Sequence, residues 1–321
     1  MGSESKRALV TGATGFVGRH LVSLLLRESY EVTALCMPGD PLRTVIPTEV
    51  DCLEVDVTDQ AGMADALTSA RPDFLFHLAG LVGSNNLEQL LAINVLGTEH
   101  VLQAASQLPK PPRVIVPSSA AAVGLTDAPI DEQSPLYPLS AYGVSKAAQT
   151  LLAQSYARRG QAPVIIGRIF NITGPGEPPT MLCGAMAAQI VACEVAEQPP
   201  IISTGNLSPT RDFLDVRDVV RGLWLLVQHG QPGEAYNICS GEERCVEDVV
   251  RQLIAHSTLE ISQQPDPARQ RPADVPRCVG VPNPFLRSVG WQPVISLEDS
   301  LRDTLAWWRS AHQIGPTYPI E

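Results

Sequence analysis

A tyrosine and a lysine four residues apart, Tyr142 and Lys146, are the side chains of this sequence best suited to moving a proton. On a helix they would share a face about one turn apart. A tyrosine phenol, with an ordinary pKa of about 10, is a poor acid or base by itself. A neighbouring ammonium favours the phenolate and lowers that pKa, and a positively charged nicotinamide ring would add to the effect. The same spacing also arises by chance, as an exposed tyrosine and a solvated lysine, so the rest of the chain must decide.

A glycine-rich turn near the N-terminus gives this pair a context. The apolar run 8–10, typical of a buried strand, leads into TGATGFVG at 11–18, and a helical apolar pattern follows. Strand, glycine turn and helix in this order indicate a dinucleotide site. Gly12 permits the tight turn, Gly15 lets backbone approach a pyrophosphate, and Gly18 allows close helix–strand packing, while the helix N-terminus offers N–H groups to the anion. The spacing is G-x-x-G-x-x-G, and a glycine turn that binds nothing is the alternative.

The end of the second predicted strand bears on the choice of cofactor. That strand, 31–35, ends at Cys36, where an NAD site usually has an acidic residue for the ribose hydroxyls. No carboxylate there repels a 2′-phosphate, and Arg43 is the nearest basic residue, so the pattern favours NADP(H) slightly and leaves NAD(H) open. Asp56, at the end of the third predicted strand 50–57, could accept from the adenine amine or serve as a helix N-cap or turn carboxylate.

Other polar residues lie at the predicted strand ends or in the next helix. His77 ends an apolar strand and is expected to be a structural histidine with its polar atoms satisfied. Asn94 lies in the predicted helix 87–105 and is either a buried polar tie or a support of the active site. Ser119 follows the strand 113–117, and a hydroxyl at the carboxyl end of a parallel strand points into the cofactor crevice.

Strands and helices alternate through the first half of the chain, which predicts how these residues are brought together. The expected class is α/β, a Rossmann-type doubly wound parallel sheet with a smaller C-terminal substrate-binding lobe. The predicted dinucleotide-binding domain covers residues 1–172, and 213–238 returns to it. Residues 173–212 and 239–321, whose elements are shorter and less regular, form the predicted lobe.

The composition of the chain limits the classes of molecule that it is expected to bind. A chain of 321 residues that is 44% hydrophobic can bury a large core. Its net charge of −11 argues against nucleic acid or an anionic membrane surface as the main partner, although a local arginine cluster can still bind an anionic small molecule. Seven cysteines without a C-x-x-C pair, and without a metal-ligand grouping with the six histidines, suit free thiols. With no evident signal peptide or membrane-length apolar run, we expect a cytoplasmic protein.

Together these motifs resemble the extended short-chain dehydrogenase/reductase family, which modifies nucleotide-linked sugars. The resemblance covers essentially the whole chain, through TGATGFVG at 11–18, DV at 56–57, HLAG at 77–80, NVLGT at 94–98, SS at 118–119 and YGVSK at 142–146. The C-terminal half resembles the GDP-4-keto-6-deoxy-D-mannose reductases more specifically, through RIFNITGPG at 168–176, GNLSPTRDFLDVRDVVRG at 205–222, YNICSG at 236–241 and DPARQRPADVP at 266–276.

The resemblance implies a role for each matching residue. Tyr142 would be the acid/base, Lys146 would hold the nicotinamide ribose, and Ser119 would hydrogen-bond the substrate C4 oxygen. The implied substrate-binding residues are Ser119, Asn171, Arg211, Arg271 and Asp274. The two arginines would grip a nucleotide diphosphate, although surface or interdomain ion pairs are their alternative. The implied cofactor-binding residues are Gly12, Thr14, Gly15, Phe16, Val17, Gly18, Cys36, Asp56, Val57, Leu78, Ala79, Gly80, Tyr142, Lys146 and Ile169.

One departure from the family pattern narrows the reaction. A dehydratase needs a carboxylate soon after Ser119, and residues 120–124 are Ala-Ala-Ala-Val-Gly. The resemblance therefore implies NAD(P)H-dependent reduction of the C4 ketone of a nucleotide-linked 4-keto-6-deoxyhexose, with GDP as the expected nucleotide. A nucleotide-sugar 4-epimerase with tightly bound NAD is the alternative. A non-catalytic dinucleotide-binding regulator is a third, disfavoured because Tyr142 and Lys146 are both present.

Members of the family are commonly dimers, so the resemblance also implies a homodimer. The helix that carries Tyr142 would lie at the interface between the two copies. Four apolar residues of that helix either form the interface or pack internally: Ala147, Ala148, Leu151 and Leu152.

Overall fold

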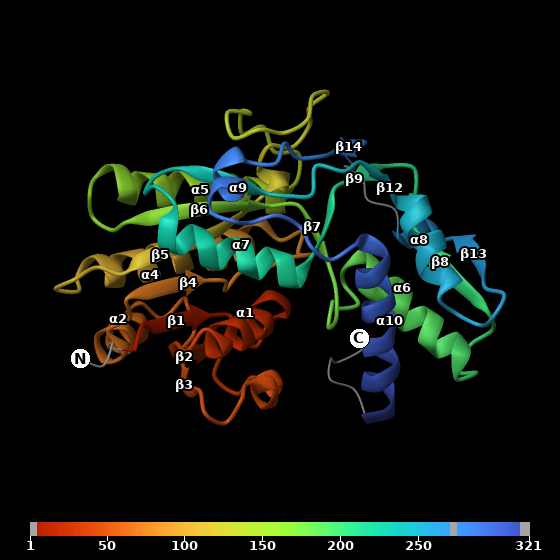
Figure 1. Cartoon of the computed structure of the whole chain (residues 1–321), viewed down its shortest axis with the longest axis horizontal. Coiled ribbons are helices and arrows are strands. Elements are labelled where there is room, and N and C mark those ends of the chain that lie inside the picture. The colour runs from red at the N-terminus through yellow and green to blue at the C-terminus, as the bar shows by residue number, and fades with distance from the viewer. Residues whose placement is uncertain (1–4, 270–274, 315–321) are drawn as a thin grey trace.

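A computed structural model describes residues 5–269 and 275–314 of the chain, and its centre is a seven-stranded sheet (Figure 1). The strands run in the order β11-β6-β5-β4-β1-β2-β3, and every neighbouring pair is parallel. They are β1 (Arg7–Thr11), β2 (Glu31–Cys36), β3 (Asp51–Glu54), β4 (Phe74–His77), β5 (Arg113–Ser119), β6 (Val164–Ile169) and β11 (Ala235–Ile238). The predicted α/β class with a Rossmann-type parallel sheet is confirmed.

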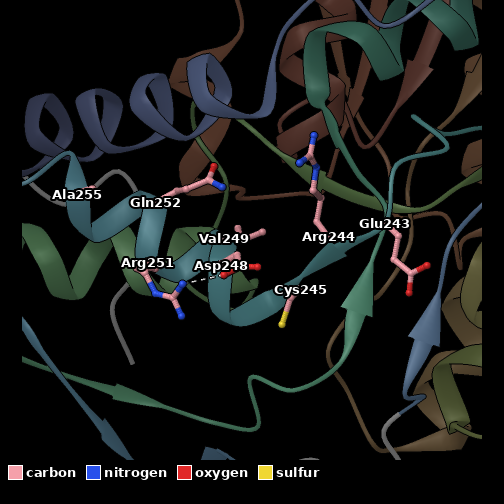
Figure 2. Close-up of a pocket in the computed structure, with 8 residues that line it drawn as sticks. All are labelled: Glu243, Arg244, Cys245, Asp248, Val249, Arg251, Gln252 and Ala255. Atoms are coloured by element: carbon pink, nitrogen blue, oxygen red, sulfur yellow. Dashed lines mark hydrogen bonds and ion pairs between the residues drawn. The ribbon is translucent and has the colours of Figure 1, made fainter.

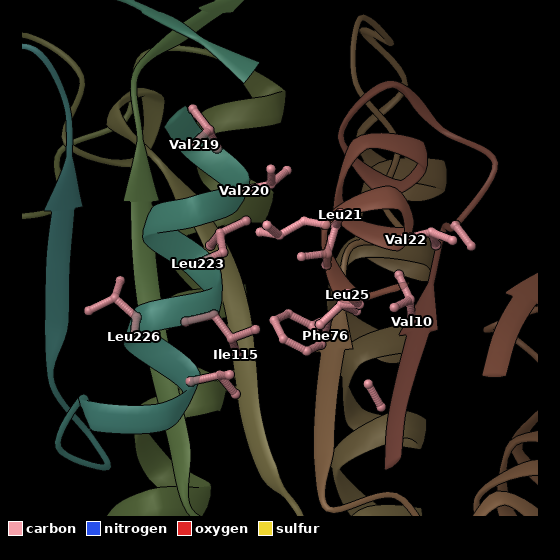
Figure 3. Packing of buried hydrophobic residues seen from close by; sticks show 14 of the residues in the cluster. Val10, Leu21, Val22, Leu25, Phe76, Ile115, Val219, Val220, Leu223 and Leu226 are labelled. Carbon is pink, nitrogen blue, oxygen red and sulfur yellow. The ribbon is translucent and has the colours of Figure 1, made fainter. Parts of the chain in front are cut away.

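Helices cover both faces of this sheet because its strands are apolar on both sides. One face is covered by α1 (Phe16–Arg27) and α7 (Val216–His229), and the other by α2 (Gln60–Ala70), α4 (Gly97–Ser106) and α5 (Ala141–Arg158). Successive strand residues alternate between the two cores, as Leu9 and Val10 do. In Figure 3, side chains of α1 and α7 point toward one another over the sheet residues Phe76 and Ile115.

The strand order places the crevice for a dinucleotide. From β1 the chain adds β2 and β3 on one side, then crosses to add β4, β5 and β6 on the other. Ligands of such sheets bind at the carboxyl ends of the strands where the order reverses, which here is between β1 and β4. The glycine turn after β1 and the segment Leu78–Gly80 after β4 therefore meet at this point.

The C-terminal part of the chain builds a second core. Its helices α6 (Leu182–Glu194), α8 (Val246–Ala255) and α10 (Leu297–Ile314) pack together through buried residues that include Ile190, Val249 and Leu305. Short strands join it to the main sheet and brace it: β7 (Asn171–Thr173) with β10 (Phe213–Asp215), β12 (Arg244–Cys245) with β9 (Thr210–Arg211) and β14 (Arg277–Cys278), and β8 (Ile201–Thr204) with β13 (Ser262–Pro265). The remaining short helices are η1 (Pro41–Val45), η3 (Ala120–Ala122), η4 (Pro267–Arg269) and α9 (Pro284–Ser288). None of the helices described here is long and apolar enough to cross a membrane.

The predicted continuous helix 87–105 is interrupted in the structure. A short α3 (Leu87–Leu91) passes into a π-helical turn, η2 (Ala92–Leu96), before α4 begins at Gly97. The wider turn accommodates one extra residue per turn, a feature that apolar periodicity does not reveal. It turns Asn94 inward, where the side chain is 1% exposed. The other predicted elements differ from the observed ones by a few residues at their ends. The third predicted strand, for example, extends to residue 57, but β3 ends at Glu54 because Asp56 already belongs to a turn.

Candidate active site

The glycine turn between β1 and α1 is closed by backbone contacts that leave no space for a side chain at Gly12 or Gly18. Gly12 has a φ of +64°, and a Cβ there would lie 2.7 Å from the backbone nitrogen of Ala79. A Cβ on Gly18 would lie 2.1 Å from the Gly12 carbonyl oxygen. Gly15 is the N-cap of α1 and has no side chain to cap it, so the first N–H groups of the helix face the turn. This arrangement suits an anion at the helix N-terminus.

The side chains around this turn are held by neighbouring loops. Thr14 Oγ1 donates to Asp40 Oδ2 at 2.6 Å, which ties the turn to the segment after β2. Phe16 contacts His20 edge-on, and Val17 packs against the core between α1 and α7. Ile169, at the end of β6, is buried and lies opposite Ser119 in the sheet.

The end of β2 carries two thiols and an arginine. Cys36 is buried, and its Sγ lies 2.8 Å from Sγ of Cys52 on β3. Burial raises the pKa of Cys36 to about 12, with the Cys52 contact adding to the effect. Arg43 hydrogen-bonds the Cys52 thiol, which raises the arginine pKa, so a guanidinium lies next to the position where NAD sites have a carboxylate.

Asp56 and Val57 follow the carboxyl end of β3. Asp56 Oδ1 accepts from the backbone N–H and the hydroxyl of Thr58, both at 2.8 Å, so the carboxylate belongs to a turn. Helix α2 is capped by Asp59 instead. Val57 packs against Gly97, where a Cβ would lie 2.9 Å from Cγ2 of the valine.

Tyr142 and Ser119 are brought together by the start of α5. Ser140 caps this helix by accepting from Gly143 N at 3.0 Å, and a Cβ on Gly143 would lie 2.4 Å from the carbonyl oxygen of Ala121. The first turn of α5 therefore packs directly on η3, which Ser119 caps. Burial raises the pKa of Tyr142, and the hydrogen bond with Ser119 opposes that rise. The phenol is thus held in its protonated form.

Lys146 lies one turn further along α5 and is 8% exposed. Its Nζ donates to the Pro117 carbonyl oxygen at 2.6 Å and to Oε1 of Gln149. Burial lowers the pKa of this ammonium to about 7. The expectation that Lys146 lowers the pKa of Tyr142 is not met in the protein alone, because burial dominates there and the ammonium is directed to Pro117 and Gln149.

Asn94 and His77 are both buried beneath the crevice. Asn94 Oδ1 accepts from Leu81 N at 2.7 Å, while Nδ2 donates to Leu81 O and to Ser145 Oγ, each at 3.0 Å. Asn94 therefore ties the loop after β4 to the helix of Tyr142. His77 bonds Thr hydroxyls on both sides, and burial together with Lys146 lowers its pKa to about 3, as suits a neutral structural histidine.

The proposed substrate residues lie at the junction with the C-terminal core. Asn171 on β7 receives support from Asp212, whose carbonyl oxygen accepts from Nδ2 at 3.3 Å. Arg211 lies on β9, the central strand between β12 and β14. Its neighbour Asp212 is fully buried, and the carboxylate accepts four bonds from Ser240, Gly241 and Gly280. Arg271 and Asp274 lie outside the residues that the structure describes.

A separate hollow of about 390 Å³ lies on the outer side of the C-terminal core (Figure 2). It is lined by Glu243, Arg244, Cys245, Asp248, Val249, Arg251, Gln252 and Ala255. Figure 2 shows Arg251 directed to Asp248, at 2.9 Å, so part of its charge is already balanced. Among the predicted site residues that the structure describes, none lines this hollow.

Sequence reasoning did not single out Gln149 as a site residue, although it contacts the ammonium of Lys146. The sequence did contain a signal for this contact. Lys146 and Gln149 are three residues apart on a helix and are therefore neighbours, and a buried amide there would need polar partners. It also did not single out Asp212, which fixes the backbone next to Arg211.

Comparison with known proteins places these features in a family. A sequence profile described as the NAD dependent epimerase/dehydratase family matches residues 8–239. The GDP-6-deoxy-D-mannose reductase of Pseudomonas aeruginosa is 33% identical in an alignment of 315 positions that covers 95% of this chain and 98% of that protein. The dTDP-6-deoxy-L-talose 4-dehydrogenase (NAD(P)(+)) of Kitasatospora kifunensis is 28% identical, over 92% and 94% of the two chains. The structure of RMD from Pseudomonas aeruginosa complexed with NADPH superimposes with a TM-score of 0.82, at 29% identity over 95% of this chain and 99% of that one.

Proposed function

The chain belongs to the NAD dependent epimerase/dehydratase family of NAD(P)-dependent enzymes, and from this premise we propose that it reduces the C4 ketone of a GDP-linked 4-keto-6-deoxyhexose. The observation that carries the proposal is the partly buried Tyr142, whose phenol interacts with Ser119, beside the carboxylate-free segment 120–124. Ketone reduction needs a proton donor, and the phenol of Tyr142 carries its proton at neutral pH. Elimination of water needs an added carboxylate that this segment does not provide.

The roles of the three residues follow from their positions. When bound, NAD(P)H would supply the hydride for C4. Ser119 would orient the ketone oxygen by a hydrogen bond, and Tyr142 would donate its proton to that oxygen as the alcohol forms. Lys146 would hold the nicotinamide ribose, and its charge would stabilise the phenolate left behind until solvent returns the proton.

The residues at the crevice fit a dinucleotide. The backbone of the glycine turn and the N-terminus of α1 suit the pyrophosphate, and the segment Leu78–Gly80 lies against the turn. For the adenosine end we propose a preference for NADP(H), with NAD(H) as the weaker ligand. Arg43 would contact a 2′-phosphate there, whereas the carboxylate of Asp40 is engaged by Thr14.

We propose that the substrate diphosphate binds beside Arg211, with Arg271 as a second guanidinium and Asn171 and Asp274 on the sugar and ribose. Support comes from the buried Asp212, which fixes the strand carrying Arg211, and from the relative that acts as a GDP-6-deoxy-D-mannose reductase. A thermal-shift screen with GDP, UDP and TDP tests the nucleotide, because a ligand of the folded state raises the melting temperature. GDP is expected to give the largest rise, and a larger rise with UDP or TDP would overturn the choice.

We also propose that two copies associate through α5. Leu151 is 56% exposed and Val144 is 39% exposed, seven residues apart on one helix face. Leu96 and Leu87, from the adjoining η2 and α3, are exposed beside them. Of the four residues named from the sequence, Ala147 and Leu152 pack internally. The exposed face of α5 therefore combines Leu151 with Val144, which was not one of those four. An apolar face of this kind suits a second copy of the chain.

The test of the activity is consumption of NADPH in the presence of a GDP-4-keto-6-deoxyhexose. A reductase oxidises one NADPH for each ketone reduced. An epimerase regenerates its cofactor, so sugar conversion without added reductant would favour the epimerase alternative and contradict the proposal.

A further inference from the structure

Lys146 forms one end of a chain of buried polar side chains beneath the crevice. Its Nζ donates to Oε1 of Gln149, and Nε2 of Gln149 donates to Oγ1 of Thr98 at 2.7 Å. The ring of His77 continues the chain, with Nε2 2.9 Å from Thr98 Oγ1 and Nδ1 2.9 Å from Oγ1 of Thr11. Of these five residues, Lys146 is the most exposed, at 8%. The chain thus links α5 to the end of β1.

Donors and acceptors in this chain permit a single assignment. Thr98 gives its only hydroxyl hydrogen to the carbonyl oxygen of Asn94, at 2.6 Å. Its oxygen must therefore accept from both Gln149 and His77. This fixes the amide of Gln149 with Nε2 toward Thr98 and Oε1 toward Lys146, and it places the ring hydrogen of His77 on Nε2.

The far end of the chain is equally fixed. Nδ1 of a neutral His77 accepts from the Thr11 hydroxyl, and Thr11 Oγ1 accepts in turn from the N–H of Ala79 at 3.0 Å. A protonated ring would place a hydrogen on Nδ1, and the Thr11 hydroxyl hydrogen would lose its acceptor. Burial and Lys146 also lower the pKa of His77 to about 3. The neutral ring is therefore a rigid support for Thr98.

We propose that Gln149 is a positioning residue, which holds the ammonium of Lys146 where it serves the cofactor and Tyr142. The inference rests on the proposed function for the role of Lys146. Two of the three ammonium hydrogens go to Pro117 O and to Gln149 among the described residues, and the third is left for the nicotinamide ribose. Because Thr98 holds the other end of the amide, Gln149 cannot rotate away without leaving a buried polar group unpaired.

Two substitutions separate this role from a structural one. Gln149→Met has similar length but removes the acceptor for Lys146. Gln149→Glu keeps an acceptor and adds negative charge next to the ammonium. Gln154→Met is the matched control, since Gln154 lies on the same helix and bonds Gly233 O at 3.4 Å, away from Lys146.

The direct readout is the titration of Lys146 in protein labelled with ¹³C at lysine Cε. The chain has three lysines, Lys6, Lys110 and Lys146, so arginine substitutions of the first two assign the third. In the unaltered protein Lys146 is expected to titrate at about 7. Gln149→Met is expected to lower its pKa further, and Gln149→Glu to raise it. Gln154→Met is expected to leave it unchanged.

NADPH affinity is the second readout. Gln149→Met is expected to weaken NADPH binding by on the order of tenfold, the loss of one charge-assisted hydrogen bond, while Gln149→Glu stays within a few fold. An unchanged Lys146 titration and an unchanged NADPH affinity in Gln149→Met would overturn the proposal. If that variant does not fold, a Lys146 pKa that fails to rise in Gln149→Glu overturns it equally. Neither readout uses the sugar substrate, so failure of the proposed function would appear separately, as absent turnover in the unaltered protein.

Discussion

The burial of Lys146 predicts how the stability of the protein depends on pH. Its pKa is about 7 in the folded protein and 10.5 in the unfolded chain. Between these values the unfolded chain binds a proton that the folded protein does not, so the free energy of unfolding rises with pH. Each pH unit in this window is worth about 1.36 kcal/mol. Below pH 7 the full cost of holding the ammonium in the interior, about 5 kcal/mol, is present in the folded state.

Replacing the lysine with Lys146→Met removes this titration. The variant also leaves Pro117 O and Gln149 without their donor, but that loss does not depend on pH. The difference in free energy of unfolding between the unaltered protein and the variant is therefore expected to change by about 3 kcal/mol from pH 7 to pH 9.5, in favour of the unaltered protein at the higher pH. Urea unfolding at several pH values measures this difference. Parallel curves for the two proteins would refute the account of Lys146.

Three further outcomes follow from the described geometry. Gly15→Ala is expected to weaken NADPH binding with little loss of stability, since its Cβ would lie 3.2 Å from the Gly12 carbonyl oxygen. Gly18→Ala is expected to lower the melting temperature clearly, because its Cβ would lie 2.1 Å from the same oxygen. Equal melting temperatures for the two variants would contradict this reading of the turn. Arg43→Ala is expected to lower affinity for NADPH, measured by titration, on the order of tenfold more than for NADH; an equal effect on both would argue against a 2′-phosphate contact. Leu151→Asp is expected to yield monomers in light scattering, and an unchanged mass would place the interface elsewhere.

The fold could be predicted from patterns between residues that are close together in the sequence. The glycine turn between an apolar strand and a helix, and the alternation of strands with helices after it, depend on short-range chemistry that a single sequence displays. Tyr142 and Lys146 belong to the same class, since their relation is set by helical spacing within α5.

Features set by packing between distant segments could not be predicted in this way. The inward turn of Asn94 depends on the π-helical turn, whose extra residue disturbs no apolar pattern. The raised pKa of Tyr142 depends on desolvation of the phenol by the packing around it, whereas the sequence indicates only the nearby charges that would lower that pKa. Likewise, which face of α5 remains exposed is decided by its packing on β5 and β6. That packing buries Ala147 and leaves Val144 at the surface.

The central claim is that Tyr142 donates the proton in an NADPH-dependent reduction of a 4-keto sugar. The most direct measurement is single-turnover oxidation of bound NADPH by a GDP-4-keto-6-deoxyhexose, in the unaltered protein and in Tyr142→Phe. The account predicts rapid oxidation in the first and a rate lower by on the order of 10²–10⁴ in the second, with NADPH binding retained in both. Oxidation at the same rate in Tyr142→Phe would contradict it.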